Sequence, residues 1–484
     1  MHRALQITEI LTMILRAIDP RYQRRVAAAM AATCRTFSET ANDVVWEDLQ
    51  SPRPLLRCLP DEVSSRSRTL EECARFLTHA ARVRTLQLQE EDADDIQDHL
   101  ATLLAIRSCG TTTLLPGLRD IVVESDFVSE SDHIEPSETS NALYLYLFLS
   151  PTLRTAQLET WGIESLQLIH QVATFCPQLQ YLGVNRFPER AGLVRCFNTL
   201  EDFSACEGSI DAAVLDEMAY LPSLRVFRVA IPDDFSHIER HWPQDRLFTA
   251  LQSLYLNGPS DPRHVAKFLR SVNSKQLHTL SLYLSECQTD DVLKVLDAAS
   301  KFTTLRSLEV QVHSHQTEFH SSFPPQAILK LHHLETLEFT LGGMPVTSHS
   351  AQVLGRACPK LRDLKVKHDR DHYWPLDVLE SFAVHLPSLE TLNTELNTEL
   401  ASTLDEPKAR SQAPICLKLD GADLSEEHWK PTAAYIARVY PNATFKSGSL
   451  WADGPDEMLK RYNRGQLYWR YVGRAVAKAR SDTS

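Results

Sequence analysis

A short pattern of apolar positions recurs along most of the chain. It reads apolar-x-x-apolar-x-apolar, and its last three residues alternate as they do in a half-buried strand. The pattern begins at Val83, Leu118, Leu153, Leu179, Leu200, Leu224, Leu251, Leu277, Leu305, Leu334, Leu361 and Leu389. These starting points lie about 28 residues apart on average, which indicates an internal repeat rather than chance matches.

The residues between successive patterns predict helices. Apolar side chains there recur at steps of three and four, as at Val265, Phe268 and Leu269. A proline stands just before several of the strands, as at Pro222 and Pro359, where it ends the helical pattern. Each repeat is therefore predicted to contain one strand, one turn and one helix.

A strand and one helix cannot bury their apolar faces alone, so the units are expected to stack. Stacking predicts an α/β solenoid over residues 81–445, with parallel strands on the concave face and helices outside. The repeated residues resemble leucine-rich repeats of the long, helix-containing kind. The alternative is an ordinary α/β domain whose parallel strands share a leucine-rich pattern.

The first fifty residues follow a different pattern. One helix face is formed by Ile7, Ile10, Leu11, Ile14, Leu15 and Ile18. Thr8 is predicted to cap this helix, and Pro20 is predicted to end it. Further helical stretches are predicted over residues 24–33 and 37–49. Because three short helices make only a small core, we expect this module to present an exposed apolar face to a partner.

Three segments of the module resemble an F-box: residues 5–11 (LQITEIL), 32–37 (ATCRTF) and 45–49 (VWEDL). Residues 54–60 (PLLRCLP) are similar to the segment that follows the box in many fungal F-box proteins. The resemblance implies that residues 1–50 bind a Skp-type adaptor, which connects to a cullin and a ubiquitin-conjugating enzyme. The implied adaptor-binding residues are Ile7, Thr8, Ile10, Leu11, Ile14, Phe37 and Trp46.

Two other interpretations of the module stay open. One is that residues 1–50 are a helical cap that seals the first repeat. The other is that Phe37 and Trp46 hold the three helices together instead of contacting an adaptor. Residues 51–80 are predicted to be a linker and entry cap in either case.

The resemblance implies a non-catalytic subunit of a ubiquitin ligase complex, in which the repeats bind a protein substrate and need no cofactor or metal. Alternation places a set of side chains on the exposed strand face. The predicted substrate-binding residues are Gln157, Glu159, Asn185, Arg228, Tyr255, Asn257, Tyr283, Glu309, Gln311, Glu338, Lys365 and Lys367. The alternative function is a leucine-rich-repeat scaffold that binds a protein partner without ubiquitin transfer.

Composition narrows the class of partner. The chain carries 50 basic and 63 acidic residues, and its net charge of −13 disfavours nucleic acid as the main partner. The ten cysteines form no C-x-x-C pair, which favours a reducing compartment in the cytoplasm or nucleus. No signal peptide or membrane span is predicted, and no motif of a hydrolase or nucleotide-binding enzyme is found.

Three charged or polar clusters remain. Histidines at 313, 315, 320, 332 and 333 are interpreted as a polar surface, not as a metal site. The acidic run over residues 90–98 is interpreted as a solvated loop and helix start, with attraction of a basic substrate as the alternative. Residues 446–484 are predicted to form a basic helical cap or tail, and their interleaved aromatic residues leave single-stranded nucleic acid or acidic lipid as alternatives.

Overall fold

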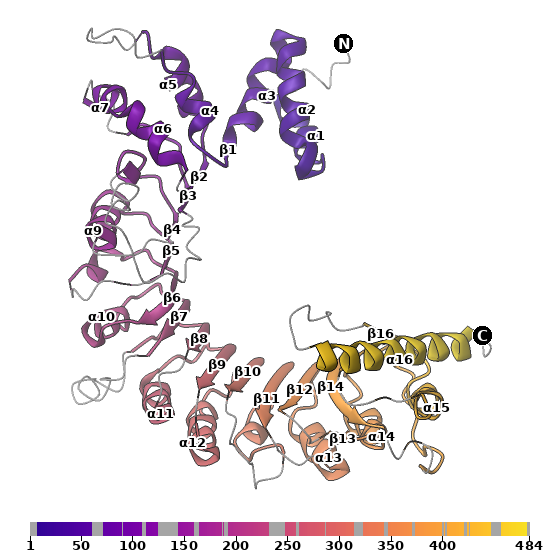
Figure 1. Cartoon of the computed structure of the whole chain (residues 1–484). Helices are drawn as coiled ribbons and strands as arrows, with labels where there is room; N and C mark the ends of the chain where they lie inside the picture. Colours follow the sequence, from indigo (N-terminus) through magenta and orange to yellow (C-terminus); the bar gives the residue numbers. More distant parts are fainter. Residues whose placement is uncertain are drawn as a thin grey trace. The chain divides into compact units, whose positions relative to one another are not determined.

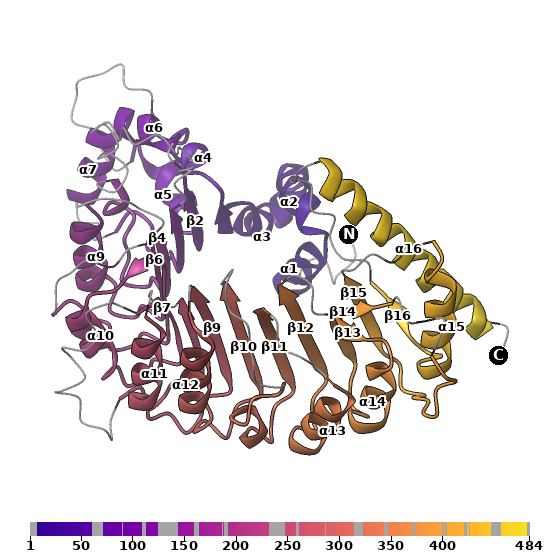
Figure 2. The same ribbon diagram turned by 60° about the horizontal axis from the view of Figure 1, so that its bottom comes forward.

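The structure is a computed structural model of the 484-residue chain. It describes residues 7–60, 71–89, 91–108, 113–123, 144–158, 164–185, 187, 192–231, 247–257, 261–285, 287–313, 323–342, 347–369, 373–398, 401, 404–420, 424, 426–446 and 456–481. The chain forms two compact units, Met1–Leu224 and Arg225–Ser484. Figure 1 and Figure 2 show that, in each unit, helices line one side of a row of strands.

Three helices open the first unit: α1 (Thr8–Arg16), α2 (Pro20–Thr33) and α3 (Arg35–Glu47). Two local predictions were wrong. Thr8 is the first residue of α1 and does not cap it, because Ile7 occupies the N-cap position. Pro20 begins α2 instead of ending α1, since proline at a first helical position loses no hydrogen bond. The side chain of Asp19 caps α2 by accepting a hydrogen bond from the Arg21 N–H.

The repeats of the first unit form a parallel sheet. Its strands are β1 (Asp48–Leu49), β2 (Thr85–Leu88), β3 (Asp120–Val123), β4 (Thr155–Leu158), β5 (Tyr181–Val184) and β6 (Asp202–Ser209). Its helices are α4 (Arg53–Leu56), α5 (Ala74–Ala80), α6 (Asp92–Asp98), α7 (Leu100–Ser108), α9 (Glu164–Phe175) and α10 (Ala212–Met218), with η3 (Val194–Cys196). The sheet starts directly after α3, so β1 lies inside the segment predicted to be the F-box.

The second unit continues the same repeat. Its strands are β7 (Val226–Ala230), β8 (Ser253–Asn257), β9 (Thr279–Ser285), β10 (Ser307–His313), β11 (Thr336–Gly342), β12 (Asp363–Asp369), β13 (Trp374–Pro375), β14 (Thr391–Asn397), β15 (Cys416–Asp420) and β16 (Thr444–Phe445). Its helices are α11 (Pro262–Ser271), α12 (Thr289–Ala299), α13 (Ser348–Ala357), α14 (Val378–His385), α15 (Trp429–Val439) and α16 (Asp456–Ser481), with η6 (Ile328–Lys330). Among the described residues all strand pairs are parallel, and β13 alone pairs outside the main order.

The core follows the sequence pattern. In the repeat that begins at Leu224, this residue, Phe227 and Val229 are all buried. The helices end where the proline signal predicts, since α13 stops at Ala357, two residues before Pro359. The predicted α/β solenoid of leucine-rich repeats, with parallel strands on one side and helices on the other, is therefore confirmed.

One backbone feature joins consecutive repeats. In most repeats the residue immediately before the strand, called the ladder position below, accepts two hydrogen bonds at its carbonyl oxygen from N–H groups of the next repeat. The carbonyl of Arg84, for example, accepts from the Arg119 N–H at 2.7 Å and from the Asp120 N–H at 3.0 Å. The same pair of hydrogen bonds is accepted by the carbonyls of Arg119, Arg154, Gln180, Arg225, Gln252, His278, Arg306, Glu335 and Arg362. The side chain at the ladder position is therefore not needed for repeat stacking and is free to vary.

Candidate protein-interaction surfaces

The three N-terminal helices form a small core of their own. Leu11 and Leu15 of α1 are buried against Ala27 of α2 and Ala41 of α3. Phe37 is partly buried and packs on this core from α3. Leu11 and Phe37, two of the predicted adaptor-binding residues, thus contribute to the interior of the module.

An apolar row remains outside this core. Ile7 is 46% exposed and Ile14 is 43% exposed, and Ile10 between them is half-buried. Their spacing of three and four residues places them along one face of α1. Met13 and Tyr22 are also exposed but lie outside this row, because Met13 is off the predicted face of α1 and Tyr22 belongs to α2. Thr8 is exposed at the start of α1.

Trp46, the last predicted adaptor residue, joins α3 to the first repeat. Its ring stacks on His79 of α5 at 4.2 Å between ring centroids. Burial, and then the nearby Arg82 and Arg75 guanidiniums, lower the pKa of His79, so the neutral ring is favoured in this stack. Arg82 also donates to Asp43 of α3 at 2.8 Å. These contacts attach the helical module to the repeats of the same unit.

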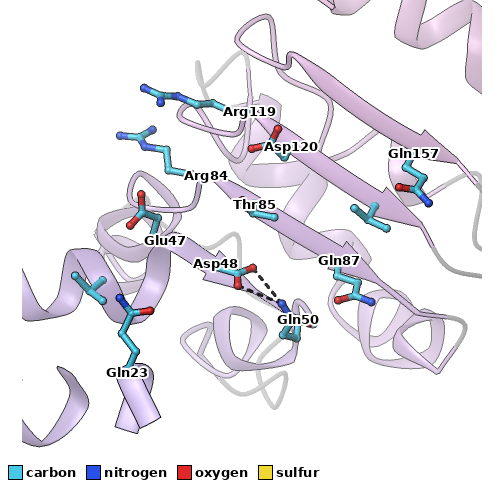
Figure 3. Close-up of a pocket in the computed structure, with 12 residues that line it drawn as sticks. Gln23, Glu47, Asp48, Gln50, Arg84, Thr85, Gln87, Arg119, Asp120 and Gln157 are labelled. Carbon is cyan, nitrogen blue, oxygen red and sulfur yellow. Dashed lines mark hydrogen bonds between the residues drawn. The ribbon is translucent and has the colours of Figure 1, made fainter. Parts of the chain in front are cut away.

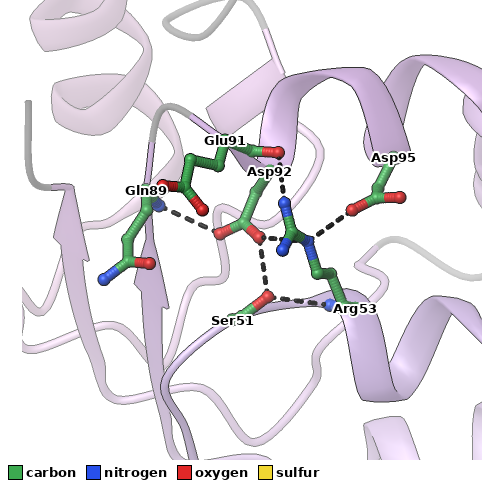
Figure 4. A network of polar contacts seen from close by, with 6 residues as sticks. All are labelled: Ser51, Arg53, Gln89, Glu91, Asp92 and Asp95. Atoms are coloured by element: carbon green, nitrogen blue, oxygen red, sulfur yellow. Dashed lines mark hydrogen bonds and ion pairs between the residues drawn. The ribbon is translucent and has the colours of Figure 1, made fainter.

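A polar network makes a second attachment (Figure 4). Asp92 is 2% exposed, accepts a hydrogen bond from Ser51 at 2.6 Å and forms an ion pair with Arg53 at 3.3 Å. Arg53 also pairs with Asp95 at 2.5 Å, and Asp92 accepts from the Gln89 N–H at 3.0 Å. The predicted helix start is present, but Asp92 is not solvated, because the segment after α3 folds over it. Sequence alone could not pair this acidic run with an arginine forty residues earlier.

The strand face, meaning the side of the sheet that the helices leave uncovered, carries the predicted substrate-binding residues of the second unit. The pairing register aligns Arg228, Tyr255, Ser281, Glu309, Glu338, Lys365, Asn393 and Lys418 in one row. Asn257, Tyr283, Gln311, Thr340 and Lys367 form the next row. Alternation thus placed these side chains correctly.

Much of the first row is engaged in contacts with neighbouring strands. The Arg228 guanidinium lies over the Tyr255 ring at 4.9 Å. Glu309 accepts hydrogen bonds from Ser281 at 2.9 Å and from Gln311 at 2.5 Å. Glu338 forms an ion pair with Lys365. Glu338 and Lys365 therefore neutralise one another across adjacent strands, whereas Glu309 next to Glu338 is stabilised by hydrogen bonds.

The predicted residues of the first unit divide into three cases. Gln157 is half-buried on β4 and lines a cavity. Asn185, just after β5, is only 8% exposed, so it does not lie on the exposed surface that alternation predicted. Glu159 lies outside the residues that the structure describes.

The cavity of the first unit measures about 640 Å³ and lies between the helical module and strands β2–β4 (Figure 3). Its polar lining combines cations, carboxylates and amides. These residues are Arg84, Arg119, Glu47, Asp48, Asp120, Gln23, Gln50, Gln87 and Gln157, with Thr85 beside them. Figure 3 shows the two arginine side chains extending toward the same side. Apart from Gln157, none of these residues was predicted from the sequence to belong to a site.

A second cavity, of about 560 Å³, lies in the second unit between β16 and α16. The predicted basic C-terminal segment forms α16, whose Trp469, Val472 and Val476 are buried. Gly473 permits close packing, because an added Cβ there would lie 3.1 Å from the Phe445 side chain. Lys446, Arg470, Arg474 and Arg480 line this cavity. The helix thus covers the last strand of the sheet and leaves a basic groove beside it.

Other chemistry is sparse in the described part of the chain. No group of three His, Cys, Asp or Glu residues there is arranged to hold a metal ion. Burial raises the pKa of Cys176 to about 12 and that of Cys358 to about 11, so both thiols stay protonated. Within the same residues, no helix combines the length and apolar character needed to cross a membrane.

Comparisons with known proteins add little to this geometry. No protein-family model and no curated sequence matches the chain. A crystal structure of the Rad7 and Elc1 complex in yeast matches with 14% identity and a TM-score of 0.37, over 76% of this chain and 88% of that chain. The plant peptide hormone receptor RGFR1 in complex with RGF2 matches with 11% identity and a TM-score of 0.29, over 77% and 69%. Both TM-scores are below 0.5, so the fold assignment rests on the repeat geometry of this chain.

Proposed function

We propose that this chain is the substrate-recognition adaptor of a Skp–cullin–F-box ubiquitin ligase. In this proposal, the N-terminal helices bind the Skp-type adaptor and the repeats bind a protein substrate. The chain carries out no bond chemistry. It contributes proximity, because holding the substrate near the conjugating enzyme raises the effective concentration of the two.

The observation that carries the proposal is the apolar row on α1. Ile7, Ile10 and Ile14 leave aliphatic surface exposed on a helix whose opposite face already has a core. Desolvated aliphatic anchors dominate the energy of many protein interfaces, and these residues fall in the segment that resembles an F-box. Leu11 and Phe37 support the module from within, so their role in adaptor binding is indirect.

The attachment of the module to the repeats also supports the proposal. Proximity is effective only when the substrate is held at a fixed position relative to the adaptor. The stack of Trp46 on His79 and the pairing of Arg53 with Asp92 fix α3 and the following segment on the first repeats. A flexible linker at residues 51–60 would not serve this purpose as well.

The test is co-expression of the full chain with a Skp-type adaptor, followed by size-exclusion chromatography and affinity measurement. We expect co-elution, and we expect Ile7→Asp combined with Ile14→Asp to weaken binding by more than about 30-fold. Tyr22→Asp, at an exposed aromatic residue on α2, is the matched control and should retain binding. Circular dichroism checks that all variants stay folded.

Failure of the wild-type chain to co-elute would contradict the proposal. The same conclusion would follow if the double variant bound the adaptor as well as the wild type does. The chain would then be better described as a repeat scaffold that binds a partner without ubiquitin transfer. Binding by the repeats to such a partner would not depend on Ile7 or Ile14.

A further inference from the structure

Three consecutive repeats of the first unit carry arginine at the ladder position. These residues are Arg84 before β2, Arg119 before β3 and Arg154 before β4. Neighbouring strands in a sheet lie about 4.8 Å apart, so the three side chains start from adjacent points along one edge of the strands. The register of β2, β3 and β4, in which Thr85 pairs with Asp120 and Asp120 pairs with Thr155, confirms that they are aligned.

These arginines have few partners within the unit. Arg84 donates one hydrogen bond to the Gly117 carbonyl at 2.9 Å. Arg119 and Arg154 are exposed, and within the described part of the chain their guanidiniums form no ion pair or side-chain hydrogen bond. Asp120 follows Arg119 directly, but no ion pair joins the two among the described residues.

The second unit shows that this arrangement is not required by the fold. Its ladder position alternates in sign over four repeats, and neighbouring side chains pair. Arg306 lies 3.6 Å from Glu335, and Arg362 lies 3.7 Å from Glu390. In the first unit three consecutive ladder residues are arginine, between Glu47 before β1 and Gln180 before β5, so Arg119 has a like charge on both neighbouring repeats.

Two of the three arginines open onto the cavity of the first unit. Arg84 and Arg119 line it, and Figure 3 shows their side chains directed to the same side. Two carboxylates of the cavity wall are engaged elsewhere: Glu47 pairs with Arg16 at 3.0 Å, and Asp48 accepts from Gln50 at 3.2 Å. Among the described residues, Arg84, Arg119 and Asp120 are therefore the lining charges without an ion pair.

We propose that Arg84, Arg119 and Arg154 form a docking site for an acidic segment of a protein partner. The proposal rests on the proposed function in taking the repeats as a protein-binding surface, and it names the chemistry of the segment they bind. Carboxylates of the segment pair with the arginines through charge-assisted hydrogen bonds. The amide of Gln87 in the cavity wall offers both a donor and an acceptor to the main chain of the segment.

The surroundings favour a polypeptide over a nucleic acid. A phosphate backbone carries charge at every step and would meet Glu47, Asp48 and Asp120 in the same cavity. A peptide places its carboxylates singly, so it can use the arginines and avoid these acids. The net charge of −13 also opposes approach of a polyanion to the chain as a whole.

The experiment selects peptide ligands for the full chain from a random library displayed on phage. The best binders are then synthesised with a fluorescent label, and their affinity is measured by anisotropy. We expect enrichment of Asp and Glu in the selected peptides. Arg119→Glu combined with Arg154→Glu should weaken binding by about 10-fold or more, since two charge-assisted contacts are lost and two like charges are introduced.

Arg306→Glu combined with Arg362→Glu is the matched control, because it makes the same substitution at the same position of two repeats in the second unit. This control should keep wild-type peptide affinity. The proposal is overturned if the selected peptides lack acidic residues, or if both double variants lose affinity equally. It is also overturned if a mixed-sequence single-stranded oligonucleotide binds through Arg119 and Arg154 and the acidic peptides do not.

The outcome is separable from that of the proposed function. Co-elution with the Skp-type adaptor depends on Ile7 and Ile14 and should be unchanged by Arg119→Glu with Arg154→Glu. If this double variant loses peptide binding and still binds the adaptor, the result supports the docking site and leaves the proposed function untouched. If the chain binds acidic peptides but no Skp-type adaptor, the docking site is supported and the proposed ligase function is contradicted.

Discussion

The two units use the same repeat but treat surface charge differently. In the second unit, several charges meet an opposite charge on the neighbouring repeat, as with Glu338 and Lys365 on the strand face or Arg306 and Glu335 at the ladder position. In the first unit, three arginines stand in a row, and Arg119 and Arg154 have no partner among the described residues. The fold tolerates both arrangements, because the backbone carbonyl at the ladder position joins the repeats and the side chain of that residue is not involved.

This difference separates charges that stabilise from charges that remain available to a ligand. Paired charges at the surface contribute up to about 1 kcal/mol to stability and leave little for a partner. Two unpaired cations about 5 Å apart repel by about 0.8 kcal/mol in water, which an anionic ligand relieves. A row of like charges without ion-pair partners therefore indicates a binding surface better than the total number of charged residues does.

The largest expected effect breaks a buried pairing in the first unit. Asp92→Ala removes the acceptor of Ser51 and the buried partner of Arg53, and we expect a loss of about 2–3 kcal/mol in unfolding free energy. Asp95→Ala is the matched control, since Asp95 is exposed and should contribute below about 1 kcal/mol. Urea denaturation of the full chain, followed by circular dichroism, measures both values. Equal losses would show that burial of Asp92 is unimportant.

A smaller effect is expected on the strand face of the second unit. Glu338 and Lys365 are each partly exposed, so their coupling should be about 0.5–1 kcal/mol. A double-mutant cycle of Glu338→Gln and Lys365→Met measures this coupling, which should shrink in high salt. A coupling of zero at low salt would mean that this pair does not hold the row together.

The smallest effect concerns thiol reactivity and leaves stability unchanged. Cys196 is exposed, whereas Cys176 and Cys358 are buried with a raised pKa. At pH 8 a maleimide should therefore label Cys196 in the folded chain, and the two buried thiols should react only in denaturant. Mass spectrometry of labelled peptides checks the pattern in both units. Rapid labelling of Cys358 in the native chain would contradict the burial of this thiol at the end of α13.

Much of the fold could be predicted from the sequence, because stacking of repeats depends on local apolar periodicity. The strands that begin after Leu224 and Leu361, for instance, occur where the pattern places them. The strands β1, β13, β15 and β16 escaped the pattern, whose last match begins at Leu389. Strand-face residues such as Glu309 and Lys365 were also placed correctly, since alternation fixes the face of each side chain.

The sites were harder to predict, because they depend on contacts between repeats. Nothing local marks Asp92 as the buried partner of Arg53, and helical periodicity alone does not separate buried Leu11 from exposed Ile14. The arginine row left a signal that was available, since Arg119 and Arg154 each follow the first leucine of the pattern. Alignment of the repeats by that leucine reveals the row, although only the structure shows that it is unpaired.

The most direct test of the difference between the two units makes the same substitution in each and measures two properties of the full chain. Arg119→Glu with Arg154→Glu should lose affinity for acidic peptides and keep its unfolding free energy within about 0.5 kcal/mol. Arg306→Glu with Arg362→Glu should keep the affinity and lose up to about 1 kcal/mol of stability. If the first-unit variant loses stability and keeps its affinity for acidic peptides, the assignment of unpaired charges to binding is wrong.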